Sequence, residues 1–244
     1  MSIVFKTYLT PSIPREIFII LAEYLEEQCN IKVNLIFETT SSGPKKGAMI
    51  EEDLAFMCTP PYYWLKESFT NNIELVPYAP VFEDSRNKNL PLYFSDILVH
   101  SDNQEIKSLN DLNQHVWAYN DTESLSGYFC IKNQMSNLKL ICSGSHLNSI
   151  QMVQNKQADI TCIDSNVLLY NKHDLKHIGT FGPHPVQPCI IRSDCKYKNE
   201  IIEAFKNINE SNVILKLNEL KISEFKKVDD DFYFNKYSID NLLT

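Results

Sequence analysis

With 244 residues, the chain has room for one large domain or for two lobes of about 100 residues each. Its composition, 43% hydrophobic and 22% charged, is ordinary for a globular protein, and no apolar run approaches the ~18 residues of a membrane-spanning helix, so no membrane insertion is expected. The net charge is −8 and there is no basic run or stripe, which argues against a nucleic-acid partner and against an anionic membrane surface.

The first part of the chain alternates between short apolar runs and helical patterns. Such alternation is typical of βαβ units and a mainly parallel sheet. The predicted strands are residues 3–8, 31–37, 54–58, 73–79 and 94–100, and the predicted helices are residues 14–29 and 61–67. A polar turn over residues 39–44 follows the second strand. It lies beyond the carboxyl end of that strand, where α/β proteins bind ligands.

The second part of the chain continues the alternation. The predicted elements are a strand over 116–119, a helix from Tyr128, a helix over 147–156, a buried strand over 158–163 that ends at Asp164, a returning strand over 189–191, and a helix over 198–220. Prolines at 183–188 interrupt the pattern and are expected to stiffen a hinge crossing. The acidic and aromatic segment 229–234 is expected to pack back on the first lobe.

These crossings predict a discontinuous two-lobe organisation. The chain is expected to enter the second lobe near residue 99 and to leave it at the proline cluster. Lobe 1 accordingly comprises residues 1–98 plus 186–244, and lobe 2 comprises residues 99–185.

The turn Ser124–Gly127 stands where a strand passes into a helix. The first amides of a helix lack internal partners, and the helix dipole adds partial positive charge there. Hydroxyls of Ser124 and Ser126 beside such amides would form a cradle for a phosphate, phosphonate or carboxylate group. An ordinary serine N-cap is the alternative interpretation. His146 and Asp164 should project from the same sheet edge, because ligands of α/β sheets bind beyond the carboxyl ends of strands.

Several segments, taken in order, resemble the phosphonate and phosphate-binding proteins of ABC transporters. The resemblance covers about residues 1 to 210 and rests on the combination of Ser-x-Ser-Gly at 124–127, Gly-Ser-His at 144–146 and Ala-Asp-x-x-x-x-Asp at 158–164. The segments 53–61, 92–99 and 108–112 agree as well. The resemblance implies a two-lobed type II periplasmic-binding-protein fold of the α/β class, with a mixed sheet in each lobe and a ligand cleft between the lobes.

The resemblance also implies a set of ligand-binding residues. Ser124 and Ser126, with the amides of Leu125 to Gly127, would hold the anion's oxygens, His146 would contact it from the second turn, and Tyr93 would close on it. The implied set is Ser41, Ser42, Tyr93, Ser124, Leu125, Ser126, Gly127, His146, Asp164 and Gln187.

The resemblance further limits the class of ligand. Where an aminoalkylphosphonate binder of the family places acidic groups around the ammonium, this chain has Asn166 and Gln187. A buried ammonium without a counter-charge is costly, so an uncharged or apolar substituent is expected. Asp164 would either substitute for the missing carboxylate or cap a helix over 165–171. The candidate walls for the substituent are Tyr62, Tyr63, Trp64 and Tyr93, with core packing as the alternative.

Motifs of cofactor enzymes are lacking in the sequence. The six glycines form no G-x-G-x-x-G or Walker loop, and the seven cysteines and six histidines show no metal-ligand spacing, so no cofactor and no metal site are expected. A binding protein for a small anionic molecule is therefore favoured over a catalyst. Two alternatives stay open, namely an enzyme on the same fold with His146 and Asp164 as an acid–base pair, and a cytoplasmic ligand-sensing module.

The first predicted strand begins at residue 3, and the sequence shows no basic segment followed by an apolar stretch and a cleavage site, the pattern of a secretory leader. A cytoplasmic location is expected on this ground, or a periplasmic one if a leader has been removed. The same observation argues against a transporter partner.

Overall fold

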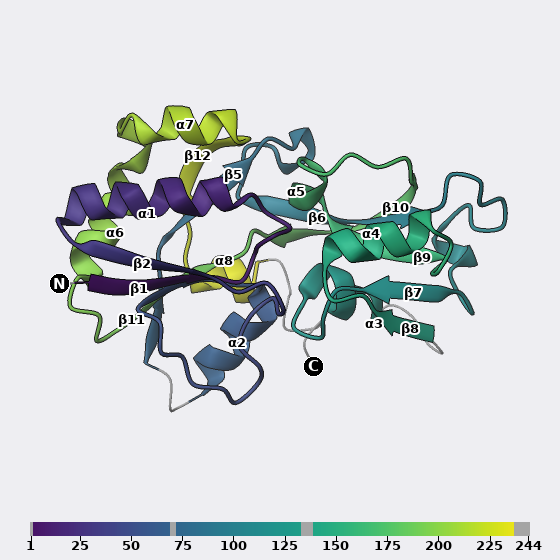
Figure 1. The fold of residues 1–244 in the computed structure, drawn as a ribbon, viewed down its shortest axis with the longest axis horizontal. Coiled ribbons are helices and arrows are strands. Elements are labelled where there is room, and N and C mark those ends of the chain that lie inside the picture. Colours follow the sequence, from purple (N-terminus) through teal and green to yellow (C-terminus); the bar gives the residue numbers. More distant parts are fainter. Residues whose placement is uncertain (1, 69–71, 133–138, 237–244) are drawn as a thin grey trace.

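The computed structural model describes residues 2–68, 72–132 and 139–236. Within these ranges the strands form two five-stranded sheets and one two-stranded ribbon. Figure 1 shows the two larger sheets side by side, each with its own helices, so that the molecule has two lobes. The α/β class with a mixed sheet in each lobe is therefore confirmed.

The first sheet has the strand order β2-β1-β3-β11-β4. Strands β1 (Ser2–Thr7), β2 (Lys32–Phe37) and β3 (Leu54–Phe56) are parallel. Strand β11 (Cys189–Arg192) is antiparallel to β3 and to β4 (Ile73–Leu75). A segment from late in the chain thus lies between two early strands.

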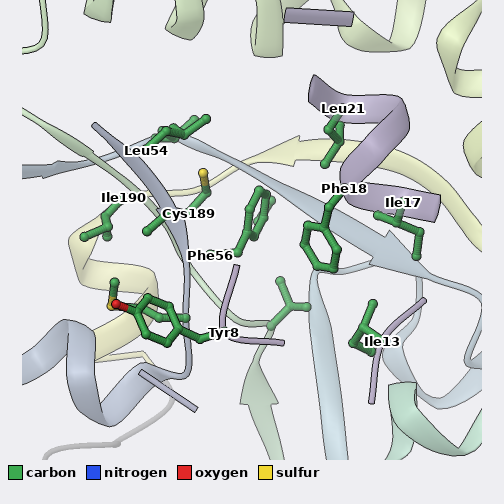
Figure 2. Packing of buried hydrophobic residues seen from close by; sticks show 14 of the residues in the cluster. Tyr8, Ile13, Ile17, Phe18, Leu21, Leu54, Phe56, Cys189 and Ile190 are labelled. Carbon is green, nitrogen blue, oxygen red and sulfur yellow. The ribbon is translucent and has the colours of Figure 1, made fainter. Parts of the chain in front are cut away.

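Helix α1 (Arg15–Cys29) covers this sheet, and Figure 1 shows it running along β1 and β2. It follows Pro14 and ends at Asn30, whose left-handed φ of 51° closes the last turn. Its apolar face reaches the strands, since the rings of Phe18 and Phe56 lie 5.6 Å apart between centroids (Figure 2). Helix α6 (Lys198–Asn207) packs beside it, where the Tyr24 hydroxyl donates to the carbonyl of Ala204 over 2.8 Å.

The second sheet has the strand order β10-β6-β9-β7-β8. Its strands are β6 (Leu92–Val99), β7 (Val116–Tyr119), β8 (Lys139–Cys142), β9 (Ile160–Asp164) and β10 (Lys176–Pro185). The three strands β7, β8 and β9 are parallel, whereas β6 is antiparallel to both β9 and β10. Its helices are α3 (Cys130–Lys132), α4 (His146–Gln154) and α5 (Ser165–Leu168).

The remaining elements tie the end of the chain to its beginning. Strand β12 (Ile222–Lys227) pairs antiparallel with β5 (Tyr78–Phe82). Helix α8 (Asp230–Phe234) packs on α2 (Thr59–Glu67), with the rings of Tyr62 and Phe234 stacked 5.2 Å apart. The expectation that the acidic and aromatic segment packs on the first lobe is borne out by this contact.

Several elements differ from the sequence predictions. The strand expected over 73–79 is divided into β4 and β5, and strands β8 and β12 were not predicted. The helix expected over 198–220 is broken into α6, a 3-10 turn and α7 (Val213–Glu219). The helix expected from Tyr128 is a π-helical turn followed by the short α3. Strand β10 was not predicted, because its glycines, prolines and two register shifts disguise a strand. The 3-10 turns are Ser85–Asn87, Leu109–Asp111 and Ile208–Glu210.

The pairing of β6 bears on the boundary between the lobes. All of β6 pairs with strands of the second sheet, although the sequence division assigned residues up to 98 to lobe 1. We propose that the first boundary lies near residue 91. Residue 186, where the second boundary is expected, falls between the end of β10 and the start of β11, and this boundary stays a prediction.

Candidate functional site

One pocket gathers polar side chains from both sheets. It encloses about 510 Å³, including space that opens to solvent. Its wall comes from the segments that follow β1, β2, β7 and β9, together with the start of α4 and Gln187. Because β1 and β2 are parallel, as are β7 and β9, the pocket lies beyond the carboxyl ends of strands, where α/β proteins bind ligands.

Seven of the ten residues predicted for the site line this pocket. They are Ser41, Ser42, Ser124, Ser126, His146, Asp164 and Gln187. Tyr93 and Leu125, each 0% exposed, and Gly127 do not line it. The roles of all ten as ligand contacts stay predictions.

The sequence left two interpretations of the turn after β7, a serine N-cap and a wall of the ligand pocket, and the turn has both features. Ser124 is the N-cap of a π-helical turn, Leu125–Phe129, and its hydroxyl accepts from the amide of Gly127 over 3.1 Å. Ser124 nevertheless also lines the pocket. The amide of Leu125 donates to the sulfur of Cys58, another lining residue, over 3.3 Å. π-helical turns are rare and recur at functional sites.

Gly127 is required by the packing of this turn. A Cβ atom at this position would lie 1.9 Å from Oδ1 of Asn120. The amide nitrogen of Asn120 donates to Ser42 over 3.1 Å and to Asp121 over 2.9 Å. The absence of a side chain at Gly127 therefore allows Asn120 to reach the polar residues of the pocket.

Ser126 and His146 lie side by side in the wall of the pocket. The Ser126 hydroxyl lies 3.4 Å from Nε2 of His146, the first residue of α4. The other ring nitrogen, Nδ1, is buried and has no hydrogen-bond partner among the described residues. Burial lowers the pKa of His146 to about 4, so the imidazole is neutral at pH 7. A neutral imidazole offers one N–H donor to an anion.

Asp121 joins the two halves of the pocket. Its Oδ2 accepts from the Ser42 hydroxyl over 2.6 Å, and its Oδ1 accepts from the amide of Glu123 over 2.9 Å. Burial raises the pKa of Asp121 to about 6. Sequence reasoning missed Asp121 and Asn120, although both come directly after β7 and so stand at the ligand edge of the sheet.

Asp164 ends β9 at the base of the pocket and is 1% exposed. Its Oδ1 accepts from the amide of Asn166 over 2.8 Å, which makes it the N-cap of α5, and its Oδ2 accepts from the Gln187 amide. Burial raises the pKa of Asp164 to about 7. Neither ring nitrogen of His146 is bonded to Asp164 among the described residues, so the acid–base pair is not formed.

The predicted aromatic wall is not part of this pocket. Tyr62 is fully buried against α8, Trp64 meets the ring of Phe129, and Tyr93 packs 5.2 Å from the ring of His184. The core-packing alternative is therefore correct for Tyr62 and Tyr93, each 0% exposed. Tyr8 supplies an aromatic side chain to the pocket instead, and its hydroxyl donates to Glu52 over 2.7 Å.

Solved structures with this fold share the architecture across nearly the whole chain. A binding protein of an ABC phosphonate transporter from Pseudomonas aeruginosa has a TM-score of 0.74 at 19% identity, over 94% of this chain and 82% of that one. PhnD1 from Prochlorococcus marinus, in complex with methylphosphonate, has a TM-score of 0.74 at 14% identity, over 99% and 96%. A Candida albicans protein with the generic periplasmic binding protein fold has a TM-score of 0.63 at 13% identity, over 99% and 89%.

A search of curated protein sequences gave no match. Within the described residues, the helices are all too short or too polar to cross a membrane. The family model for the periplasmic substrate-binding protein of phosphonate ABC transporters matches residues 3–233. This family is periplasmic by description, so the expected cytoplasmic location finds no support. The chain belongs to the family of periplasmic phosphonate-binding proteins of ABC transporters.

Proposed function

We propose that this protein binds a small phosphonate or phosphate-type anion in the pocket between its two lobes and presents it to an ABC transporter. The observation that carries the proposal is the convergence of Ser124, Ser126 and His146 on one pocket at the carboxyl ends of β7 and β9. Family membership supports both the ligand class and the transporter partner.

Anion recognition here would rely on neutral donors. Among the described residues, no lysine or arginine lines the pocket, so hydroxyls, amides and one imidazole must replace the water around the anion. An anion beside His146 would favour the imidazolium form and oppose the effect of burial on its pKa. The raised pKa values of Asp121 and Asp164 also allow these acids to become neutral as the anion enters.

Calorimetric titration with methylphosphonate and with inorganic phosphate tests the proposal. Ser126 is the cleanest position to change, because its hydroxyl is not the cap of the turn. Each charge-assisted hydrogen bond contributes roughly 1.5–3 kcal/mol, so Ser126→Ala should weaken binding at least tenfold. Replacing both Ser124 and Ser126 by alanine should weaken it about a hundredfold or more.

The control is Ser223→Ala, the same change on β12, where the hydroxyl donates to the carbonyl of Val81 outside the pocket. It should leave affinity unchanged. Because Ser124→Ala also removes a cap, worth about 1 kcal/mol, unfolding of each variant is measured in parallel. Unchanged affinity in the double variant would place the anion elsewhere.

A further inference from the structure

A second cavity adjoins the anion pocket inside the first lobe. It spans about 320 Å³, including space that opens to solvent, and its wall includes Ile13, Ile17, Phe18, Phe56, Phe82 and Phe225. We call it the annex. The annex and the anion pocket share Leu9, Ile13 and Gln187 as lining residues, so the two cavities lie next to each other.

The wall of the annex is apolar apart from Gln187. In the part of the chain that the structure describes, no charged side chain lines the annex, whereas the adjoining pocket has Asp121 and Asp164. Two of its aromatic side chains pack on each other, since the rings of Phe18 and Phe56 meet edge to face with centroids 5.6 Å apart. Figure 2 shows Ile13 and Ile17 beside the Phe18 ring in this part of the core.

An apolar group gains free energy when it leaves water for a space lined by apolar side chains. A space of this kind next to a polar ligand pocket is suited to an apolar group of the same ligand. Gln187, which is 7% exposed, lies at the junction with its amide turned to Asp164. The polar and apolar parts of the combined site therefore meet at this residue.

We propose that the annex receives the substituent of the bound anion, and that the ligand is a short alkylphosphonate or alkyl phosphate ester. This inference rests on the proposed function, since it assumes that the anionic group lies at Ser124, Ser126 and His146. The residues that select for an apolar substituent would then lie at the end of β1, on helix α1 and in the β5–β12 ribbon. The aromatic residues predicted as a wall from the sequence do not line the annex.

A chain-length series tests the annex on the unmodified full chain. Methyl-, ethyl- and propylphosphonate are titrated by calorimetry in one buffer. Each methylene buried should tighten binding about fourfold until the annex is full. Propylphosphonate should also bind more than tenfold tighter than 2-aminoethylphosphonate, which has nearly the same shape but carries an ammonium into a cavity without a counter-charge.

Ile17→Ala provides an independent readout, because Ile17 lines the annex but not the anion pocket. The enlarged annex should move the tightest-binding member of the series to a longer chain, with methylphosphonate affinity unchanged. The matched control is Leu25→Ala, on the same helix and 0% exposed but outside both cavities. It should lose comparable stability and keep the original dependence on chain length.

The outcomes separate the two proposals. If methylphosphonate binds and its ethyl and propyl homologues bind no tighter, the annex proposal fails alone. If 2-aminoethylphosphonate binds more tightly than propylphosphonate, the substituent is recognised by Asp164 and the annex proposal also fails. If no member of the series binds, both the annex and the proposed function are refuted. Should Ile17→Ala not fold, the series on the unmodified chain still decides.

Discussion

The buried carboxyl group of Asp164 makes stability depend on pH in a direction that can be worked out. Burial raises its pKa in the folded protein to about 7, from an ordinary value of 3.8. Between these values the folded state holds a proton that the unfolded state has lost. The stabilisation is therefore complete below pH 4 and is lost as pH rises through 7. At ~1.4 kcal/mol per pH unit, roughly 3 kcal/mol disappears between pH 5 and pH 8.

Asp164→Asn should remove this dependence. An asparagine can still accept from the amide of Asn166 and can donate to the Gln187 carbonyl oxygen once that amide turns over. The variant should match the parent protein only below about pH 4, and its advantage should grow by roughly 3 kcal/mol between pH 5 and pH 8. Urea unfolding followed by circular dichroism, on protein freed of ligand by dialysis through urea, measures the difference at each pH. A difference that stays constant from pH 5 to pH 8 would refute the reasoning.

Two further predictions concern the pocket. Gly127→Ala should lower the melting temperature and weaken methylphosphonate binding at least tenfold, because the new Cβ would collide with Asn120. Adding Asn120→Ala should restore the melting temperature. A double variant as unstable as Gly127→Ala would contradict this account. Methylphosphonate affinity should rise as pH falls from 8 to 6, because protonation of Asp164 and Asp121 removes negative charge from the pocket. Calorimetry should find that affinity depends less on pH in Asp164→Asn. An equal dependence in that variant would show that Asp164 does not titrate in this range.

Most of the fold could be predicted because local patterns specify it. Strands β1, β2, β3, β7, β9 and β11 coincide with short apolar runs, and α1 and α4 have one apolar face. Ligands of α/β proteins bind at the carboxyl ends of strands, and this rule correctly predicted that four residues share one pocket, namely Ser124, Ser126, His146 and Asp164. Strand β10 escaped prediction because its register shifts and prolines interrupt the alternation of a regular strand.

The rest of the site depends on contacts between distant segments. Asp121 is held by Ser42, which lies 79 residues earlier, and no local pattern reports that contact. The annex arises from the packing of α1 against β5 and β12, and its residues look like any other core positions in the sequence. The aromatic cluster 62–64 was misplaced for a related reason, since the residues that cover Tyr62 come from α8 at the other end of the chain.

The place of β11 between β3 and β4 has a consequence for biosynthesis. The strands of the second sheet occupy one uninterrupted stretch, from Leu92 to Pro185, and can pair as soon as that stretch has left the ribosome. The first sheet must wait for Cys189–Arg192, so β3 keeps an unpaired edge while more than a hundred residues are made. Such late, long-range pairing slows folding. A nascent chain halted just before Cys189 would expose the edge of β3 to other chains, and the lobe that is begun first is completed last.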